Sequence, residues 1–246
     1  MMLFNIHDVY IGRSLDLYGE WSEGEIDLFR QMLQPGMVVV EVGANIGAHT
    51  VFLAQAVAPN GCVLAFEPQR IVYQTLCANL ALNHITNVQC VQAAVGSSPG
   101  ELFVPPLDYH RANNFGGLGL GEFQSGERVP VFTLDSYGIR ECALIKVDVE
   151  GMEKEVLEGA RATIARCQPL LYVENDRPDR SASLIHLISS LGYNLHWHHI
   201  PFFNPNNFNG MAENVFDTIT SINMICCPKD GRYNLEGFQP VEVPSI

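Results

Sequence analysis

Segments with strand and helix patterns alternate through most of this chain, and that alternation limits the folds open to it. The expected strands are short runs rich in Val, Ile and Leu: Met37–Val42, Cys62–Phe66, Val88–Val95, Ala143–Asp148 and Pro169–Glu174. Apolar residues recur at helical spacing in Ile46–Val57, Gln69–Leu82, Met152–Arg166 with an interruption at Gly159, and Ser183–Leu191. This order predicts an α/β fold with a doubly wound, mostly parallel sheet, in which ligands bind at the carboxyl ends of the strands.

Three more strands are expected, and the chain is of a size for one large domain. The strands are Arg128–Leu134, Tyr193–Trp197 and Ile219–Cys227, of which the last two would form a hairpin. The 246 residues contain no linker, so residues 37–246 are predicted to fold as one unit. Residues 1–36 are predicted to form a helical cover, because Ser22 and Glu25 read as a capping box for a helix through Leu33.

Composition excludes some classes of partner. The net charge of −13 disfavours binding to nucleic acid or to an anionic membrane. No apolar run reaches the roughly 18 to 20 residues of a spanning helix, and the first residues do not read as a secretory signal, so a cytoplasmic protein is expected. The seven cysteines include no CxxC pair, and most of them are expected to be buried and structural.

The first predicted strand runs into its helix through a glycine-containing turn of the kind that approaches a ligand closely. Gly43 and Gly47 lie four residues apart with Asn45 between them, and Glu41 precedes them. Glu67 ends the second strand twenty residues after Gly47, the place from which a carboxylate reaches two ribose hydroxyls. An acid for an ammonium group and an acid for a ribose together indicate S-adenosylmethionine as the ligand. At the end of the third strand, Ala94 is a further candidate for cofactor binding.

Several motifs resemble those of the FkbM-type S-adenosylmethionine-dependent methyltransferases. They are VEVGANIG (40–47), FEP (66–68), TLDS (133–136), LIKVDVEGME (144–153) and VLEGA (156–160). The family usually has Asp where this chain has Glu41. The resemblance implies a seven-stranded, Rossmann-like class I methyltransferase sheet whose last strand is antiparallel, a cofactor role for Pro68, and O-methylation of a hydroxyl on a sugar or small secondary metabolite.

Acids at the next two strand ends suggest a metal site. Asp148, Glu174 and Asn175 would offer three oxygens to one magnesium ion, an arrangement that resembles the metal site of catechol-type O-methyltransferases. Bound there, a metal would orient the acceptor oxygen and lower its pKa. The alternative without metal, in which Asp148 and Glu150 cap the following helix and Glu174 binds the substrate directly, stays open. Glu150 is a further candidate ligand, and Lys146, Asp148 and Glu150 are the candidate catalytic residues.

Other possible bases and the acceptor pocket are less sharply defined. His110, His196, His198 and His199 are alternative bases, each of which also fits an ordinary surface or structural role. Two long loops, 105–126 and 201–217, carry Asn and aromatic residues that suit a sugar-like acceptor, although mobile surface insertions are the alternative.

The sequence also allows other functions and another role for the N-terminal segment. The aromatic residues before the first helix suit a cover over the cofactor or a contact in a homo-oligomer. Besides the O-methyltransferase, the sequence allows a non-catalytic nucleotide-binding or scaffold protein and, less readily, an RNA methyltransferase.

Overall fold

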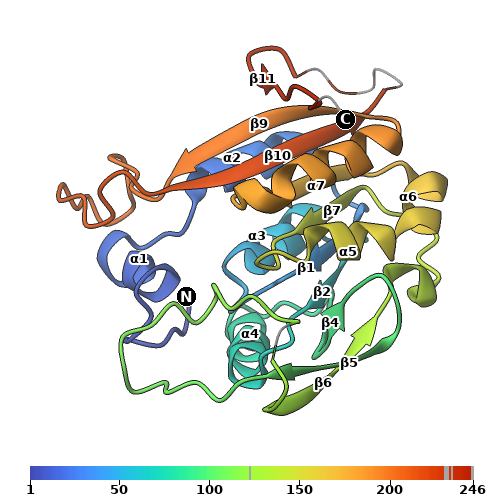
Figure 1. The fold of residues 1–246 in the computed structure, drawn as a ribbon. Helices are drawn as coiled ribbons and strands as arrows, with labels where there is room; N and C mark the ends of the chain where they lie inside the picture. The colour runs from blue at the N-terminus through green and yellow to red at the C-terminus, as the bar shows by residue number, and fades with distance from the viewer. Residues whose placement is uncertain (122, 230–232, 234, 245–246) are drawn as a thin grey trace.

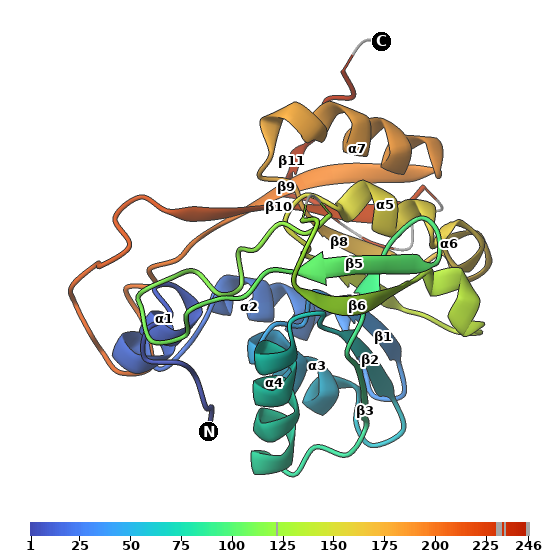
Figure 2. The same cartoon turned by 60° about the horizontal axis from the view of Figure 1, so that its bottom comes forward.

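A central sheet with helices on both faces forms the molecule (Figure 1; Figure 2). The structure is a computed structural model and describes residues 1–121, 123–229, 233 and 235–244. The elements in chain order are α1 (Ile11–Tyr18), α2 (Glu23–Met32), β1 (Val38–Val42), α3 (Ala48–Val57), β2 (Cys62–Phe66), α4 (Arg70–Leu82), β3 (Val88–Val91), β4 (Ala94–Val95), β5 (Gly100–Val104), β6 (Glu127–Phe132), a 3-10 turn (Leu134–Tyr137), β7 (Leu144–Val147), α5 (Glu153–Glu158), α6 (Arg161–Cys167), β8 (Leu170–Glu174), α7 (Pro178–Ser190), β9 (Tyr193–Pro201), β10 (Thr220–Pro228) and β11 (Gln239–Pro240).

The topology confirms the predicted α/β class. The main sheet has the order β11-β9-β10-β8-β7-β1-β2-β3. Neighbours from β3 to β8 pair in parallel, whereas β10 pairs antiparallel with both β8 and β9. The described sheet has one strand more than the seven predicted, because the two-residue β11 joins the edge of β9. A strand that short carries no periodicity that sequence reasoning can detect.

Side-chain alternation along each strand divides the core into two layers. In β1, Val40 and Val42 face one layer, which also contains apolar residues of α5, α6 and α7. Val39 faces the other layer, which contains apolar residues of α2, α3 and α4. Figure 2 shows α3 and α4 on the side of the sheet opposite α5 and α7. The same alternation places Cys226 and Cys227 in different layers, and both are buried as expected. Cys142 is also buried, whereas Cys62 is exposed and the other three cysteines are partly buried.

One predicted strand was wrong in extent. Val88–Val95 is interrupted at Gln92 and Ala93, so that β3 stays in the main sheet while β4 joins β5 and β6 in a separate three-stranded sheet. The strand β5 was not predicted, because its five residues include Gly100 and Glu101 and show little apolar alternation. This small sheet matters for the site because β4 follows the carboxyl end of β3.

The segment before β1 packs against the loop between β9 and β10. Tyr18 lies 5.4 Å from Phe203 and 5.7 Å from Phe216 between ring centroids, and Trp21 lies 4.7 Å from Phe202. In Figure 1, α1 and this loop lie on the same side of the molecule. Tyr18 and Trp21 thus pack against aromatic residues of the same chain.

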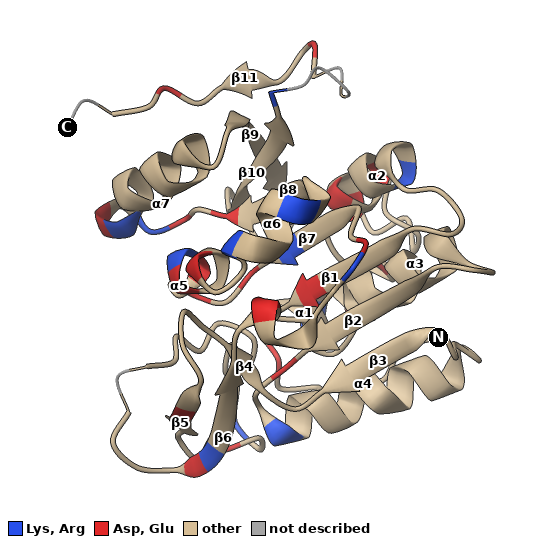
Figure 3. Ribbon diagram, turned by 90° about the vertical axis from the view of Figure 1, so that its right-hand side faces the viewer, with Lys and Arg blue, Asp and Glu red and all other residues tan. Residues whose placement is uncertain are grey.

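Among the described residues, no helix is both long and apolar enough to cross a membrane. Figure 3 shows the basic residues scattered over separate elements rather than gathered along one face.

Candidate active site

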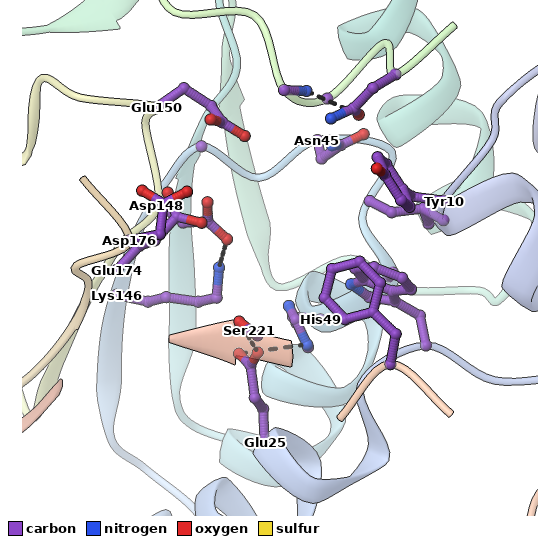
Figure 4. Close-up of a pocket in the computed structure, with 18 of the residues that line it drawn as sticks. Tyr10, Glu25, Asn45, His49, Lys146, Asp148, Glu150, Glu174, Asp176 and Ser221 are labelled. Atoms are coloured by element: carbon purple, nitrogen blue, oxygen red, sulfur yellow. Dashed lines mark hydrogen bonds and ion pairs between the residues drawn. The ribbon is translucent and has the colours of Figure 1, made fainter. Parts of the chain in front are cut away.

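A cavity of about 300 Å³ lies at the carboxyl ends of β1, β2, β7 and β8, where the α/β topology predicts a ligand site. Its lining combines carboxylates, one lysine, one histidine and aromatic rings (Figure 4). The lining residues from the main sheet and its turns are Gly43, Ala44, Asn45, Ala48, His49, Glu67, Lys146, Asp148, Glu150, Glu174, Asp176, Thr220, Ser221 and Ile222. The remaining walls come from Tyr10, Ile11, Trp21, Glu25, Asn114, Gly116, Gly117, Phe202 and Ile219.

The turn after β1 forms one wall of this cavity, and its backbone explains the choice of residues. Gly43 and Gly47 have φ values of +86° and +87°, and Asn45 between them has +51°. A Cβ at Gly43 would overlap the carbonyl oxygen of Asp148, so glycine is needed there for the close approach of the β1 and β7 ends. Gly43 and Asn45 line the cavity, whereas Gly47 lies behind it as the N-cap of α3.

Glu67 lies at the end of β2 beside this turn. Its Oε2 accepts the backbone N–H of Asn45 at 3.0 Å, and its Oε1 accepts that of Gln69 at 2.9 Å. Burial raises the pKa of Glu67 to about 7, although these two backbone donors oppose the shift. Each carboxylate oxygen keeps a lone pair, so the group can accept further hydrogen bonds from a ligand in the cavity.

A smaller apolar slot of about 40 Å³ opens next to the main cavity, and both are lined by Gly43, Glu67 and Asp148. Two residues predicted to bind the cofactor, Pro68 and Ala94, line this slot. The other lining residues are mainly apolar: Val42, Phe66, Gln69, Ala93, Val95, Gly116, Leu118, Leu120, Val149, Glu150 and Met152. A slot of this character suits a flat ring better than a charged group.

Glu41 is not among the lining residues of either cavity. It is buried on the face of the sheet toward α3, where its Oε2 accepts the hydroxyl of Thr50 at 2.6 Å. Burial raises its pKa to about 7, and the charge of Lys146 on the neighbouring strand opposes this shift. The predicted direct contact between Glu41 and the ligand's ammonium therefore has no geometric support from the lining of the described cavities.

Lys146 projects from β7 into the cavity with 2% of its side chain exposed. Its Nζ donates to Asp148 Oδ2 at 3.0 Å. Burial opposes the charge on Lys146, but the carboxylates of Asp148, Glu41 and Glu25 outweigh burial and raise its pKa. In this structure Lys146 is therefore a hydrogen-bond donor to Asp148.

Three carboxylates cluster beside Lys146. Oxygens of Asp148, Glu150 and Glu174 lie within 4.8 Å of one another. Glu150 Oε2 also accepts from Arg177 at 2.7 Å, whereas the buried Oε2 of Glu174 has no hydrogen-bond partner. Burial and the neighbouring carboxylates, Asp148 first, raise the pKa of Glu174 well above its usual range. This donor set is suited to a hard divalent cation.

Asn175 lies outside this cluster, although it was predicted as a metal ligand from the sequence. Its amide Nδ2 donates to the sulfur of Met224 at 3.3 Å, on the opposite side of the sheet. Adjacent residues at a strand end point to opposite faces, so Glu174 follows Tyr172 toward the cavity while Asn175 faces the layer of α7. Glu150 takes the third position.

Two buried residues that line the cavity were not predicted from the sequence. Glu25 of α2 and His49 of α3 have side chains only 5% and 8% exposed, and Glu25 Oε2 lies 3.7 Å from His49 Nε2. The Ser22 hydroxyl donates to Glu25 itself at 2.8 Å, so the predicted capping box is wrong in form. Burial, reinforced by the charge of Lys146, lowers the pKa of His49 to about 3. Burial also raises the pKa of Glu25, with Lys146 opposing.

The long loops contribute less than predicted. From 105–126, Asn114, Gly116 and Gly117 line the cavity, and from 201–217 only Phe202 does so among the described residues. Three Asn side chains of the second loop donate hydrogen bonds within the protein: Asn204 to Glu20, Asn207 to Met211 and Asn209 to Leu17. The alternative histidine bases His110, His196, His198 and His199 are not among the residues lining this cavity.

The fold is shared with known methyltransferases. The structure of a precorrin-6y C5,15-methyltransferase from Geobacter metallireducens GS-15 superposes with a TM-score of 0.53 at 12% identity, covering 82% of this chain and 85% of that one. The methyltransferase FkbM from Methylobacillus flagellatus KT has a TM-score of 0.52 at 18% identity, covering 81% of this chain and 50% of that one. At these identities the likeness shows a class I methyltransferase fold.

The sequence comparison is more specific. The model of the methyltransferase FkbM domain matches residues 41–195, more than half of the chain, so the protein belongs to the FkbM methyltransferase family. The curated methyltransferase sdnD of Sordaria araneosa is 31% identical over 154 residues, which cover 49% of this chain and 59% of that protein. The match thus spans less than two thirds of that curated relative.

Proposed function

We propose that this protein is an S-adenosylmethionine-dependent O-methyltransferase that acts on a hydroxyl of a sugar or small secondary metabolite. The observation that carries the proposal is the position of Glu67. Its buried carboxylate lies at the end of β2, between the turn at Gly43 and the apolar slot. A nucleoside whose ribose hydroxyls donate to Glu67 would place its base in the slot beside Pro68 and Ala94, and its aminoacyl arm along Gly43 and Asn45.

The residues around the aminoacyl arm would bind and orient the reactants. S-adenosylmethionine supplies an activated methyl group with a neutral leaving group, so the protein's contribution is mainly positioning. Lys146, held by Asp148 at 3.0 Å, presents a fixed donor to the cavity. Glu150 is held by Arg177. We assign Asp148 and Glu150 to orienting the acceptor, and Lys146 to donating a hydrogen bond to it.

A divalent cation fits the carboxylate cluster. The buried oxygen of Glu174 without a hydrogen-bond partner is the kind of atom that a cation would satisfy. Asp148, Glu150 and Glu174 would hold magnesium, and a magnesium ion would supply charge to lower the pKa of the acceptor hydroxyl. The ion would compete with Lys146 and Arg177 for two of these carboxylates.

Residues 1–36 complete the acceptor side of the cavity and serve in this proposal as its cover. Tyr10, Ile11, Trp21 and Glu25 all line it. Glu20 fixes this segment to the loop after β9, since its carboxylate accepts from Asn204 at 2.7 Å and from the backbone of Phe208 at 3.0 Å. An acceptor would then lie between the aromatic rings of the cover and the polar strand ends.

Two measurements test the proposal. Calorimetry with S-adenosylhomocysteine tests the cofactor site, and incubation with methyl-labelled S-adenosylmethionine and a panel of methyl glycosides and polyhydroxylated metabolites tests transfer. We expect binding of S-adenosylhomocysteine and label in an O-methyl product. Binding without transfer to any acceptor would favour the non-catalytic alternative, and transfer to RNA instead would contradict the acceptor class.

A further inference from the structure

Glu25 and His49 form a buried acid–histidine pair at the floor of the cavity, on the side away from the carboxylate cluster. Figure 4 shows the imidazole between Glu25 and the open centre of the cavity, across from Lys146 and Asp148. His49 Nε2 faces Glu25 Oε2 at 3.7 Å and has no hydrogen-bond partner. Both residues line the cavity, so the pair is buried from bulk solvent yet open to a bound ligand.

Glu25 is held in place by a set of donors on its other oxygen. Oε1 accepts the hydroxyl of Ser22 at 2.8 Å, the hydroxyl of Ser221 at 3.3 Å and the amide of Asn223 at 3.3 Å. These donors come from the start of α2 and from β10, so two elements far apart in sequence fix one carboxylate. The other oxygen, Oε2, lies on the side of His49, 3.7 Å from its Nε2.

The ring of His49 is fixed as well. It packs edge-on against Phe29 of α2, with ring centroids 6.0 Å apart. Burial, together with Lys146, lowers the pKa of the ring, so it is uncharged at neutral pH. The same shift weakens the ring as a base, so proton transfer to it depends on the charge of Glu25. A neutral imidazole that donates from one nitrogen to a carboxylate keeps a lone pair on the other nitrogen. A long contact in a ligand-free site can shorten when the reactants bind.

We propose that His49 is the general base that takes the proton of the acceptor hydroxyl, and that Glu25 is the positioning residue that holds its tautomer. This inference rests on the proposed function and adds the base to it. Lys146 already donates to Asp148, and Asp148 and Glu150 are each paired with a basic side chain, whereas His49 has no such partner.

The acceptor O–H gives its proton to His49 Nδ1 while its oxygen forms the new bond to the methyl carbon. The C–S bond breaks, and its electron pair stays on sulfur, which becomes the neutral thioether of S-adenosylhomocysteine. The imidazolium, stabilised by Glu25, then releases its proton to water when the products leave.

Glu25 lies outside residues 41–195, the segment that matches the family model, whereas His49 lies inside it. The pair therefore joins the family segment to the N-terminal cover. It follows that the pair is complete only when α2 packs against α3.

The test uses His49→Gln and Glu25→Gln in the full chain, with Glu23→Gln as the matched control. Glu23 is on the same helix but forms an ion pair with Arg30 outside the cavity. With the panel acceptor that is methylated, His49→Gln should lower kcat about 10²- to 10⁴-fold, with the affinity for S-adenosylhomocysteine changed less than about twofold. Glu23→Gln should match the unmodified protein. A near-normal kcat in His49→Gln would overturn the assignment while leaving the proposed function intact.

A second readout needs no acceptor and does not depend on a folded variant of His49. Two-bond ¹H–¹⁵N spectra of ¹⁵N-histidine protein in complex with S-adenosylhomocysteine identify which ring nitrogen carries the proton. We expect the Nε2–H tautomer for His49, and a mixture of tautomers in Glu25→Gln. A proton on Nδ1, or a tautomer unaffected by Glu25→Gln, would overturn the proposal. Failure of S-adenosylhomocysteine to bind would instead contradict the proposed function itself.

Discussion

Removing the charge of Glu67 should weaken cofactor binding by an amount that the geometry allows us to work out. In Glu67→Gln the side chain keeps its shape but loses its charge. One of the two backbone donors, from Asn45 or Gln69, then faces an amide NH₂. Loss of charge-assisted hydrogen bonds to ribose costs about 2 to 3 kcal/mol. The Kd for S-adenosylhomocysteine at pH 8, measured by calorimetry, should rise about 30- to 150-fold.

The pH dependence of S-adenosylhomocysteine binding is a second test of the role of Glu67. Burial raises the pKa of Glu67 to about 7, and ribose binding favours its ionised form. Affinity in the unmodified protein should therefore be constant above about pH 8 and fall up to about tenfold per pH unit below pH 7. Glu67→Gln should lack this dependence, and Glu127→Gln, an exposed acid paired with Arg70, should keep it. If Glu67→Gln and the unmodified protein bound S-adenosylhomocysteine with equal affinity, or with the same pH profile, Glu67 would not be the ribose ligand.

Three further outcomes follow from the described contacts. Gly43→Ala should destabilise the fold by at least about 3 kcal/mol in urea unfolding, because its Cβ overlaps the Asp148 carbonyl. Gly36→Ala, at φ +92° with open space around it, should cost only about 1 to 2 kcal/mol, and equal costs would contradict this account. Burial raises the pKa of Glu41 from 4.5 to about 7, so its contribution to stability is complete below pH 4.5 and is lost as the pH rises through 7. Between pH 4.5 and pH 7, the decline in the free energy of unfolding should be about 3 kcal/mol smaller in Glu41→Gln than in the unmodified protein. An equal decline in the two proteins would contradict a raised pKa at Glu41. Chelation of divalent metal should abolish transfer but not binding of S-adenosylhomocysteine, and Glu174→Gln should raise the magnesium concentration needed for half-maximal activity at least about tenfold. Full transfer in excess chelator would contradict the metal site.

The main sheet could be predicted from the sequence because its strands are buried on both faces. Runs such as Val38–Val42 and Leu170–Glu174 are almost uninterrupted apolar β-formers, which is what a covered parallel sheet requires. The parts that sequence reasoning missed have weaker signals. The strand β5 begins at an exposed glycine and glutamate, and β11 has two residues.

The site was predictable where it depends on one strand end and its own turn. Gly43 and Glu67 were found by spacing along the chain, and both line the cavity. Asn175 was misplaced because alternation turns it to the face opposite Glu174. Glu25 and His49 were not predicted as site residues because each lies in the first turn of a helix, where such residues are ordinary. Only the packing of α2 against α3 brings them to one cavity.

The most direct test of the central claim is a crystal structure of the protein with S-adenosylhomocysteine. We predict both ribose hydroxyls within about 2.5 to 2.7 Å of the Glu67 carboxylate oxygens. The adenine should lie in the slot beside Pro68 and Ala94, and the sulfur should point into the cavity toward His49. A ligand bound elsewhere, or bound with its ribose away from Glu67, would contradict the account.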